Sequence, residues 1–143
     1  MTTYTDRIPV DPAYTQALGE VVYNFATTAW MIVYLGSLVA PSFVLRESGA
    51  DFDTIATDFS LLTEIGKHPE FADISARFTA ATVRRKELEK SIPITASGGT
   101  QELDGAEDNK DHQWSVDEVI AFAKELETLD IDANALYYKL KAT

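Results

Sequence analysis

The chain has no cysteine and only two histidines, His68 and His112, among its 143 residues. Without cysteine it cannot form a disulfide framework, a thiolate metal site or a cysteine nucleophile. Two histidines are too few for a histidine-rich metal site unless many carboxylates complete the ligand set. We therefore expect neither a bound metal nor a cofactor.

Sequence signatures of phosphate binding and nucleophilic catalysis are also missing. The glycines of Ser97–Thr100 come without the lysine and the strand-to-helix setting of a P-loop. No serine lies in a nucleophile elbow or at a recognisable spacing from a histidine. The acid-rich stretch Asp104–Asp111 lacks the register of a calcium-binding EF-hand loop. A third hypothesis, carboxylate chemistry in the core through Glu20 and Glu64, falls short of a diiron ligand set.

Basic residues are scarce, with 12 Lys and Arg against 23 Asp and Glu and a formal net charge of −11. This acidity argues against direct nucleic-acid binding, which depends on neutralising phosphates. The hydrophobic content of 45% excludes wholesale disorder. The length suits one domain, which we place over residues 1–143, with residues 1–10 as an N-terminal tail.

One long stretch has no charge at all, namely the 25 residues between Glu20 and Arg46. A membrane-spanning helix needs about 20 mostly apolar residues. Here Asn24, Gly36 and Pro41 interrupt the run, and no Lys/Arg cluster flanks it. The first ten residues also lack the apolar core of a secretory signal. We interpret the stretch as a buried central helix of a soluble, cytoplasmic protein that does not enter a membrane.

Apolar spacing predicts four long helices. The first starts at Asp11-Pro12 and ends before Pro41, the second runs from Phe52 or Asp53 to about Ile65, and the third from Pro69 to about Ser91. The last opens with the capping box Ser115–Glu118 and continues almost to the end of the chain. We predict an all-α fold: an antiparallel bundle of about four long helices, with one long acidic loop before the last helix.

That loop covers residues 93–114 and is rich in Gly, Thr, Asp and Glu. Its polarity favours loose order. The alternative is a hairpin that pairs the region Gln101–Leu103 with Gln113-Trp114.

Four aromatic residues of the first helix are expected in the core, because aromatics at helical spacing usually pack inward. They are Tyr23, Phe25, Trp30 and Tyr34. Two adjacent tyrosines near the C-terminus, Tyr137 and Tyr138, cannot easily both face inward. One of them is expected at a surface or an interface.

Charge is distributed unevenly along the chain. Residues 102–132 hold eleven acids and two bases, a local charge of −9, whereas residues 77–90 hold five bases and two acids, a local charge of +3. These segments either lie against each other or bind a partner. The candidate binding residues are Arg84, Arg85, Lys86 and Lys90 in the basic segment, and Glu102, Asp104, Glu107, Asp108 and Asp111 in the acidic one.

The basic stretch Arg84–Ser91 resembles the HEPN-like helical bundles, as do the segments Leu18–Phe25 and Asn134–Tyr137. The resemblance implies a dimer of α-bundles that is often a metal-independent ribonuclease. In that family an arginine holds the scissile phosphate and a histidine moves the proton of the ribose 2′-hydroxyl. Here Arg85 matches the arginine, but Lys86 stands in place of asparagine and Lys90 in place of histidine. Because lysine is a poor general base at pH 7, the resemblance implies a degenerate site.

Two functions follow from these observations. The first is a non-catalytic, protein-binding or regulatory helical bundle, a HEPN-like domain that has lost its ribonuclease site and can form a homodimer. The second is an acidic inhibitor or decoy that blocks a basic nucleic-acid-binding or effector surface of a partner protein, as small phage and immunity proteins do. In both cases the partner is another protein, and a basic one in the second case.

Overall fold

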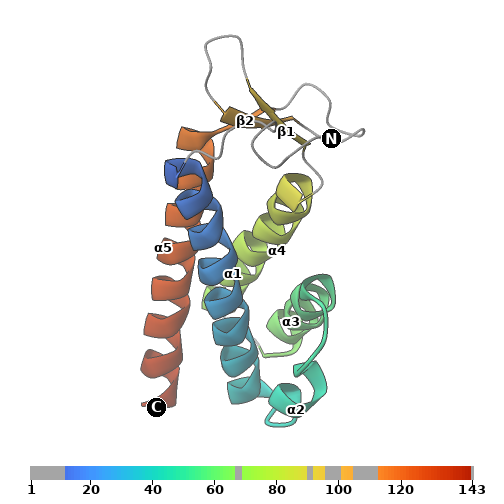
Figure 1. Ribbon diagram of the computed structural model, residues 1–143. Helices are drawn as coiled ribbons and strands as arrows, with labels where there is room; N and C mark the ends of the chain where they lie inside the picture. Colours follow the sequence, from blue (N-terminus) through green and yellow to red (C-terminus); the bar gives the residue numbers. More distant parts are fainter. Residues whose placement is uncertain (1–11, 67–68, 90–91, 96–100, 105–112, 143) are drawn as a thin grey trace.

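The computed structural model describes residues 12–66, 69–89, 92–95, 101–104 and 113–142 (Figure 1). Most of these residues are helical, which confirms the all-α class. The helices are α1 (Pro12–Val39), α2 (Phe43–Glu47), α3 (Phe52–Gly66), α4 (Pro69–Glu89) and α5 (Val116–Lys141). The strands are β1 (Ile92–Thr95), β2 (Gln101–Asp104) and β3 (Gln113–Ser115).

The four long helices begin and end close to where the sequence predicts. Pro12 opens α1, and the backbone N–H of Thr54 donates to the Asp51 carboxylate at 2.7 Å at the start of α3. At α5 the Ser115 hydroxyl accepts from the Glu118 N–H at 3.1 Å. The predicted cap is therefore present, since a side-chain oxygen satisfies an N–H that has no partner within the helix.

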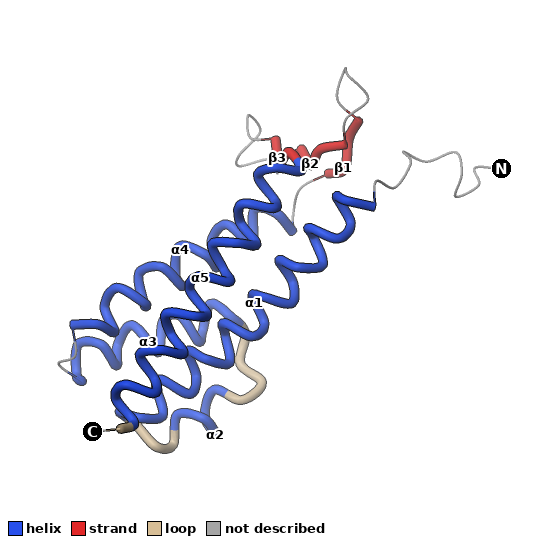
Figure 2. Tube along the Cα trace, turned by 90° about the vertical axis from the view of Figure 1, so that its left-hand side faces the viewer, coloured by secondary structure: helices blue, strands red, loops and turns tan. Residues whose placement is uncertain are grey.

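The helix directions differ from a simple up-and-down bundle. Helix α4 is antiparallel to α3 and α5, but α1 runs parallel to α5, as Figures 1 and 2 show. Three hydrogen bonds record this parallel register: Tyr14 Oη to Trp114 O, Asn24 Nδ2 to Ala123 O and Thr28 Oγ1 to Leu126 O. The reason is the segment 40–51, which leads the chain back from the end of α1 to the level of Phe25 before α3 begins.

A short helix that the sequence analysis missed, α2, lies in this return segment. Its Phe43 is fully buried and packs against α1 at Gly36. A Cβ at position 36 would overlap with the Phe43 ring. The absence of a side chain at Gly36 therefore lets α2 dock on α1.

The prediction of a loop over residues 93–114 is wrong where the strands lie. β1, β2 and β3 form an antiparallel sheet in that order, at the end of the molecule where α4 finishes and α5 begins (Figure 1). β2 pairs with β3 through Leu103 and Trp114, as the hairpin alternative expected. Because Trp114 is fully buried, this pairing joins the sheet to the helical core.

The core lies between α1, α3, α4 and α5. Phe25 is completely buried, and its ring lies 4.7 Å from that of Phe52 and 5.6 Å from that of Phe78. Helix α1 is long and apolar enough to span a membrane by length and composition, and 44% of its most apolar window is buried inside the protein. Core helices of soluble proteins meet the same criterion, so the cytoplasmic location stays a prediction.

The contact of Gly36 with Phe43 gives a first prediction. Gly36→Ala should lower the free energy of unfolding by about 1–3 kcal/mol, because the new methyl group overpacks the site. Gly19→Ala is the matched control on the same helix, since within one chain no heavy atom outside the local helix backbone lies within 4 Å of its Cβ position. That control should be neutral or stabilising by up to about 1 kcal/mol. Urea titration measures both, and equal effects of the two substitutions would contradict the account of Gly36.

Candidate functional site

The basic residues of α4 pair with acidic residues of α4 itself and of neighbouring helices. Arg77 Nη1 lies 2.9 Å from Asp132 Oδ2 and 3.3 Å from Asp73 Oδ2. Arg84 Nη1 lies 2.6 Å from Glu125 Oε2. Of the two arrangements that the sequence left open, the described residues thus support the first: the basic segment lies against part of the acidic one.

Arg84 covers aromatic rings as well as forming an ion pair. Its guanidinium carbon lies 4.5 Å from the centre of the Phe122 ring and 5.2 Å from the Trp114 ring. A guanidinium stacked on rings gains cation–π energy and shields apolar surface with its stem. Arg84 therefore joins α4, α5 and the buried tryptophan of β3.

Arg85, which matches the arginine of the HEPN-like motif, lies over a different pair of rings. Its guanidinium is 4.9 Å from the Phe25 ring centre and 4.5 Å from that of Phe52, and its Nη2 is 2.7 Å from Glu89 Oε1. Its side chain is only 23% exposed. The next residue, Lys86, forms an ion pair with Asp53 of α3. Both side chains thus pack α4 against α1 and α3.

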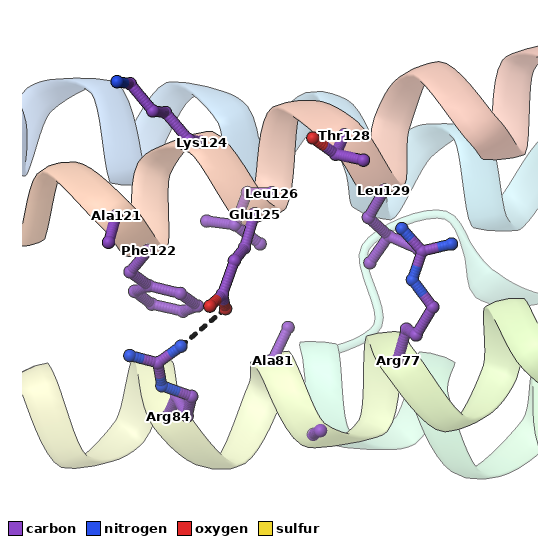
Figure 3. A pocket seen from close by; sticks show the side chains of 11 residues that line it. Arg77, Ala81, Arg84, Ala121, Phe122, Lys124, Glu125, Leu126, Thr128 and Leu129 are labelled. Atoms are coloured by element: carbon purple, nitrogen blue, oxygen red, sulfur yellow. Dashed lines mark hydrogen bonds and ion pairs between the residues drawn. The ribbon is translucent and has the colours of Figure 1, made fainter. Parts of the chain in front are cut away.

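A groove of about 600 Å³ separates α4 from α5 (Figure 3). Small side chains, including Ala81 and Ala121, leave this space, and Arg77 and Arg84 stand at separate points along its α4 side. Both arginines are already paired with carboxylates of α5. The other polar side chains of the lining are Lys124, Glu125 and Thr128. Glu125 is the carboxylate that pairs with Arg84.

The other predicted binding residues are only partly described. Glu102 and Asp104 lie on β2, opposite Ser115 and Gln113 of β3. Lys90, Glu107, Asp108 and Asp111 lie outside the described residues. Within the described part of the chain, no three His, Asp or Glu side chains gather closely enough to hold a metal ion.

Sequence reasoning missed an exposed aromatic face on α1. Phe25 is buried as expected, but the core assignment of the other three aromatics is wrong: Tyr23 is 70% exposed, Trp30 47% and Tyr34 43%. At 100° per residue these three side chains share one side of the helix, opposite to Phe25. The absence of charge over residues 21–45 is the sequence signal for this face, because an uncharged side of a helix can lie at an interface as well as in the core.

The aromatic face continues onto α5. The Tyr34 ring centre lies 6.0 Å from that of Trp30 and 6.4 Å from that of Tyr137, which in turn is 5.3 Å from Tyr138. Tyr137 is half-buried and Tyr138 exposed, which confirms that one of the adjacent tyrosines lies at the surface. We call Tyr23, Trp30, Tyr34, Leu38 and Tyr138 the aromatic face.

Glu47 is a buried carboxyl group that the sequence analysis did not single out. It ends α2, is 1% exposed, and neither of its carboxyl oxygens has a hydrogen-bond partner among the described residues. Arg46 Nε is the nearest cationic group, 3.5 Å from Oε1. Burial raises the pKa of Glu47 to about 7, the nearby Asp58 carboxyl adds to the rise, and Arg46 opposes it.

The rings beneath Arg84 generate a second prediction. Arg84→Ala should lower the free energy of unfolding by about 1–2 kcal/mol, and Arg84→Met by less, because methionine retains the apolar stem over Phe122. Glu125→Ala removes only the exposed ion pair and should cost less than about 1 kcal/mol. Thermal melts of the three variants at equal pH measure these differences. If Glu125→Ala were as damaging as Arg84→Ala, the ion pair and not the ring packing would hold α4 to α5.

The raised pKa of Glu47 generates a third prediction. The native carboxyl retains its proton up to about pH 7, whereas in the unfolded chain it ionises near 4.5. The native state therefore binds more protons between these values, and the stability from this group falls as pH rises through them. At pH 8 Glu47→Gln should be more stable than the wild type by about 3 kcal/mol, and below pH 4.5 the gain should vanish. Urea titrations from pH 4 to 8 test this. Glu127→Gln, at an exposed position of α5, is the control and should not show the gain in stability at pH 8.

Comparison with family models, with curated proteins and with solved structures finds no match to this chain. The HEPN-like resemblance therefore stays a prediction from the sequence. Function has to be inferred from the geometry of the aromatic face, the α4–α5 contact and the Glu47 carboxyl.

Proposed function

We propose that this chain is a non-catalytic, protein-binding helical bundle, and that the aromatic face binds a second copy of the chain. The observation that carries the proposal is the exposure of Tyr23, Trp30 and Tyr34 on an uncharged side of α1. Tyrosine and tryptophan are enriched at protein interfaces, where large rigid rings bury much area at little entropic cost. An exposed apolar patch of this kind marks an interaction surface.

Electrostatics permit a second copy on this surface. With a net charge of −11, two chains repel each other at most orientations. Residues 21–45 carry no charge, so α1 offers a face that two copies can bring together without opposing like charges. Charge is depleted in the same way at the centre of known interfaces.

The order of large and small residues along α1 suits a two-fold axis. A two-fold axis perpendicular to α1, at the level between Thr28 and Ala29, makes the two copies of α1 antiparallel. It places Tyr23 opposite Tyr34 of the second copy, and Gly19 opposite Leu38 of the second copy. Gly19 and Ala26 are exposed on the same side as the rings and leave room for them. In a symmetric dimer each patch has to fit itself, and alternation of large and small side chains provides that fit.

The proposed lack of catalysis is supported by the contacts of Arg85. Its guanidinium stacks on Phe25 and Phe52 and pairs with Glu89, so it is engaged in packing and not presented to a phosphate. A ribonuclease site of the HEPN-like kind needs a free arginine together with a proton-transferring histidine. The resemblance to that family agrees with the proposed dimer, as a bundle that retains the association without the chemistry.

The acidic decoy is the weaker alternative, because two acids of the −9 segment, Glu125 and Asp132, already pair with Arg84 and Arg77 of the same chain. Its remaining support lies in the acids of residues 102–118. Ionic strength separates the two functions, since salt leaves an apolar contact between like-charged copies unchanged or strengthens it, whereas it weakens an acidic-to-basic contact.

The aromatic face yields a fourth prediction. The double variant Tyr23→Ser/Tyr34→Ser should weaken self-association by about tenfold or more, because each truncated interface tyrosine costs on the order of 1–2 kcal/mol. Sedimentation velocity over a concentration series at 50 and 500 mM salt measures the dissociation constant. Trp30 is left intact because it also lines a cavity.

The matched control is Leu61→Ser/Val83→Ser, on α3 and α4, whose side chains are 53% and 52% exposed. It removes exposed apolar area away from α1 and should leave self-association unchanged. A wild-type chain that stays monomeric throughout would overturn the second copy as partner, and so would a control as weakened as the tyrosine variant. Self-association that disappears at 500 mM salt would favour an ionic contact instead.

A further inference from the structure

A cavity of about 250 Å³ lies between α1, α2 and α3, apart from the α4–α5 groove. Its floor consists of buried residues, Ala29 and Val33 of α1 and Ile55 of α3. Exposed Trp30 and Gly49 stand at its edge, which makes them the mouth. Gly49 has φ = +85°, a left-handed conformation that L side chains rarely adopt. The segment 40–51 therefore bends around an apolar cavity.

The one charged group in the lining is the Glu47 carboxyl. It is 1% exposed, and neither of its oxygens has a partner at hydrogen-bond geometry among the described residues. The Asp58 carboxyl is close enough to raise the pKa of Glu47, but a second carboxyl supplies no cation to balance the charge once Glu47 ionises. Leaving such atoms unsatisfied is costly, and buried polar groups in native proteins nearly always have a partner. Arg46 Nε at 3.5 Å does not fill this role, because the Arg46 side chain is 56% exposed and lies 5.2 Å above the Phe43 ring. A donor inside the cavity would satisfy the carboxyl.

The lining indicates what kind of donor fits. A carboxylate in the wall of an apolar cavity favours a ligand that is positively charged at one end and apolar at the other. The indole ring of Trp30 at the mouth adds the electron-rich face that attracts cations. A cavity of this volume takes a small molecule rather than a peptide segment.

We propose that this cavity binds a small alkylammonium ion, whose NH₃⁺ group donates to the Glu47 carboxylate and whose alkyl chain lies against Val33 and Ile55. The step is non-covalent and balances in protons: Glu47 releases its proton to water as the ammonium binds, and the ligand retains its own. The site borders the aromatic face at Trp30 and Ala26, but Tyr23 and Tyr34 do not line it.

The pH dependence of binding follows from the groups around the carboxyl. Asp58 of α3 and Arg46 of α2 are the charged groups that act on Glu47. Ionisation of Glu47 at about pH 7 creates the counter-ion, while an alkylammonium stays charged up to about pH 10. Affinity should therefore rise about tenfold from pH 6 to pH 8.

The fifth prediction is tested by calorimetric titration of the full chain with n-butylammonium chloride at pH 6, 7 and 8. Sodium butyrate and 1-butanol of the same chain length are the anionic and neutral probes. Butylammonium should bind with a dissociation constant on the order of 1 mM, and Glu47→Gln should weaken it about tenfold or more. Glu127→Gln, which removes an exposed carboxylate of α5, is the control for net charge and should bind as the wild type does.

Three outcomes would overturn the proposal: equal binding of 1-butanol and butylammonium, equal affinity of Glu47→Gln and wild type, or affinity independent of pH. The pH series uses the wild-type chain, so it remains informative if a variant folds poorly. Because the tyrosine double variant leaves the cavity intact, butylammonium should bind to it normally. Loss of self-association and loss of amine binding are therefore distinguishable failures.

Discussion

The parallel contact between α1 and α5 is the constraint on which the rest of the molecule depends. Side chains of α1 donate to backbone oxygens at three levels, one in β3 directly before α5 and two in α5: Tyr14 to Trp114 at 2.9 Å, Asn24 to Ala123 at 3.0 Å and Thr28 to Leu126 at 3.2 Å. Thr28 is fully buried, and its hydroxyl is shared between Asn24 O of its own helix, at 2.7 Å, and Leu126 O of α5. Any slip of one helix along the other would break all three bonds, which sets the direction and the register of the pair.

This pairing determines which surfaces remain exposed. With α5 on one side of α1 and with α3 and α4 covering the buried Phe25, the side that carries Tyr23 and Tyr34 is left uncovered. The same register brings Arg84 of α4 to Glu125 and Arg77 to Asp132. Opposite charges of the basic and acidic segments are thereby paired with each other within the chain. The uncharged face of α1 becomes the part of the surface best suited to another protein.

Local signals in the sequence predicted the helices well and the site poorly. Proline at position 12 and the Ser115 cap act within one turn, so the ends of α1 and α5 can be inferred from neighbouring residues. The helix α2 could not be inferred this way, because five residues carry too little periodicity. Glu47 illustrates the same limit for the site. Its burial comes from the docking of Phe43 on Gly36, a contact between separate helices, and no local pattern announces it.

What the sequence determined by itself is the set of long helices, the absence of cysteine chemistry and the uneven charge, because each is a property of composition or of short-range spacing. The tertiary structure alone decided that α1 runs parallel to α5, that three of its five aromatics face outward, and that a carboxyl is enclosed beside an apolar cavity. An uncharged helix is compatible with burial on every side or on one. The choice depends on how many neighbours the chain can bring to it, which is a matter of packing between distant segments.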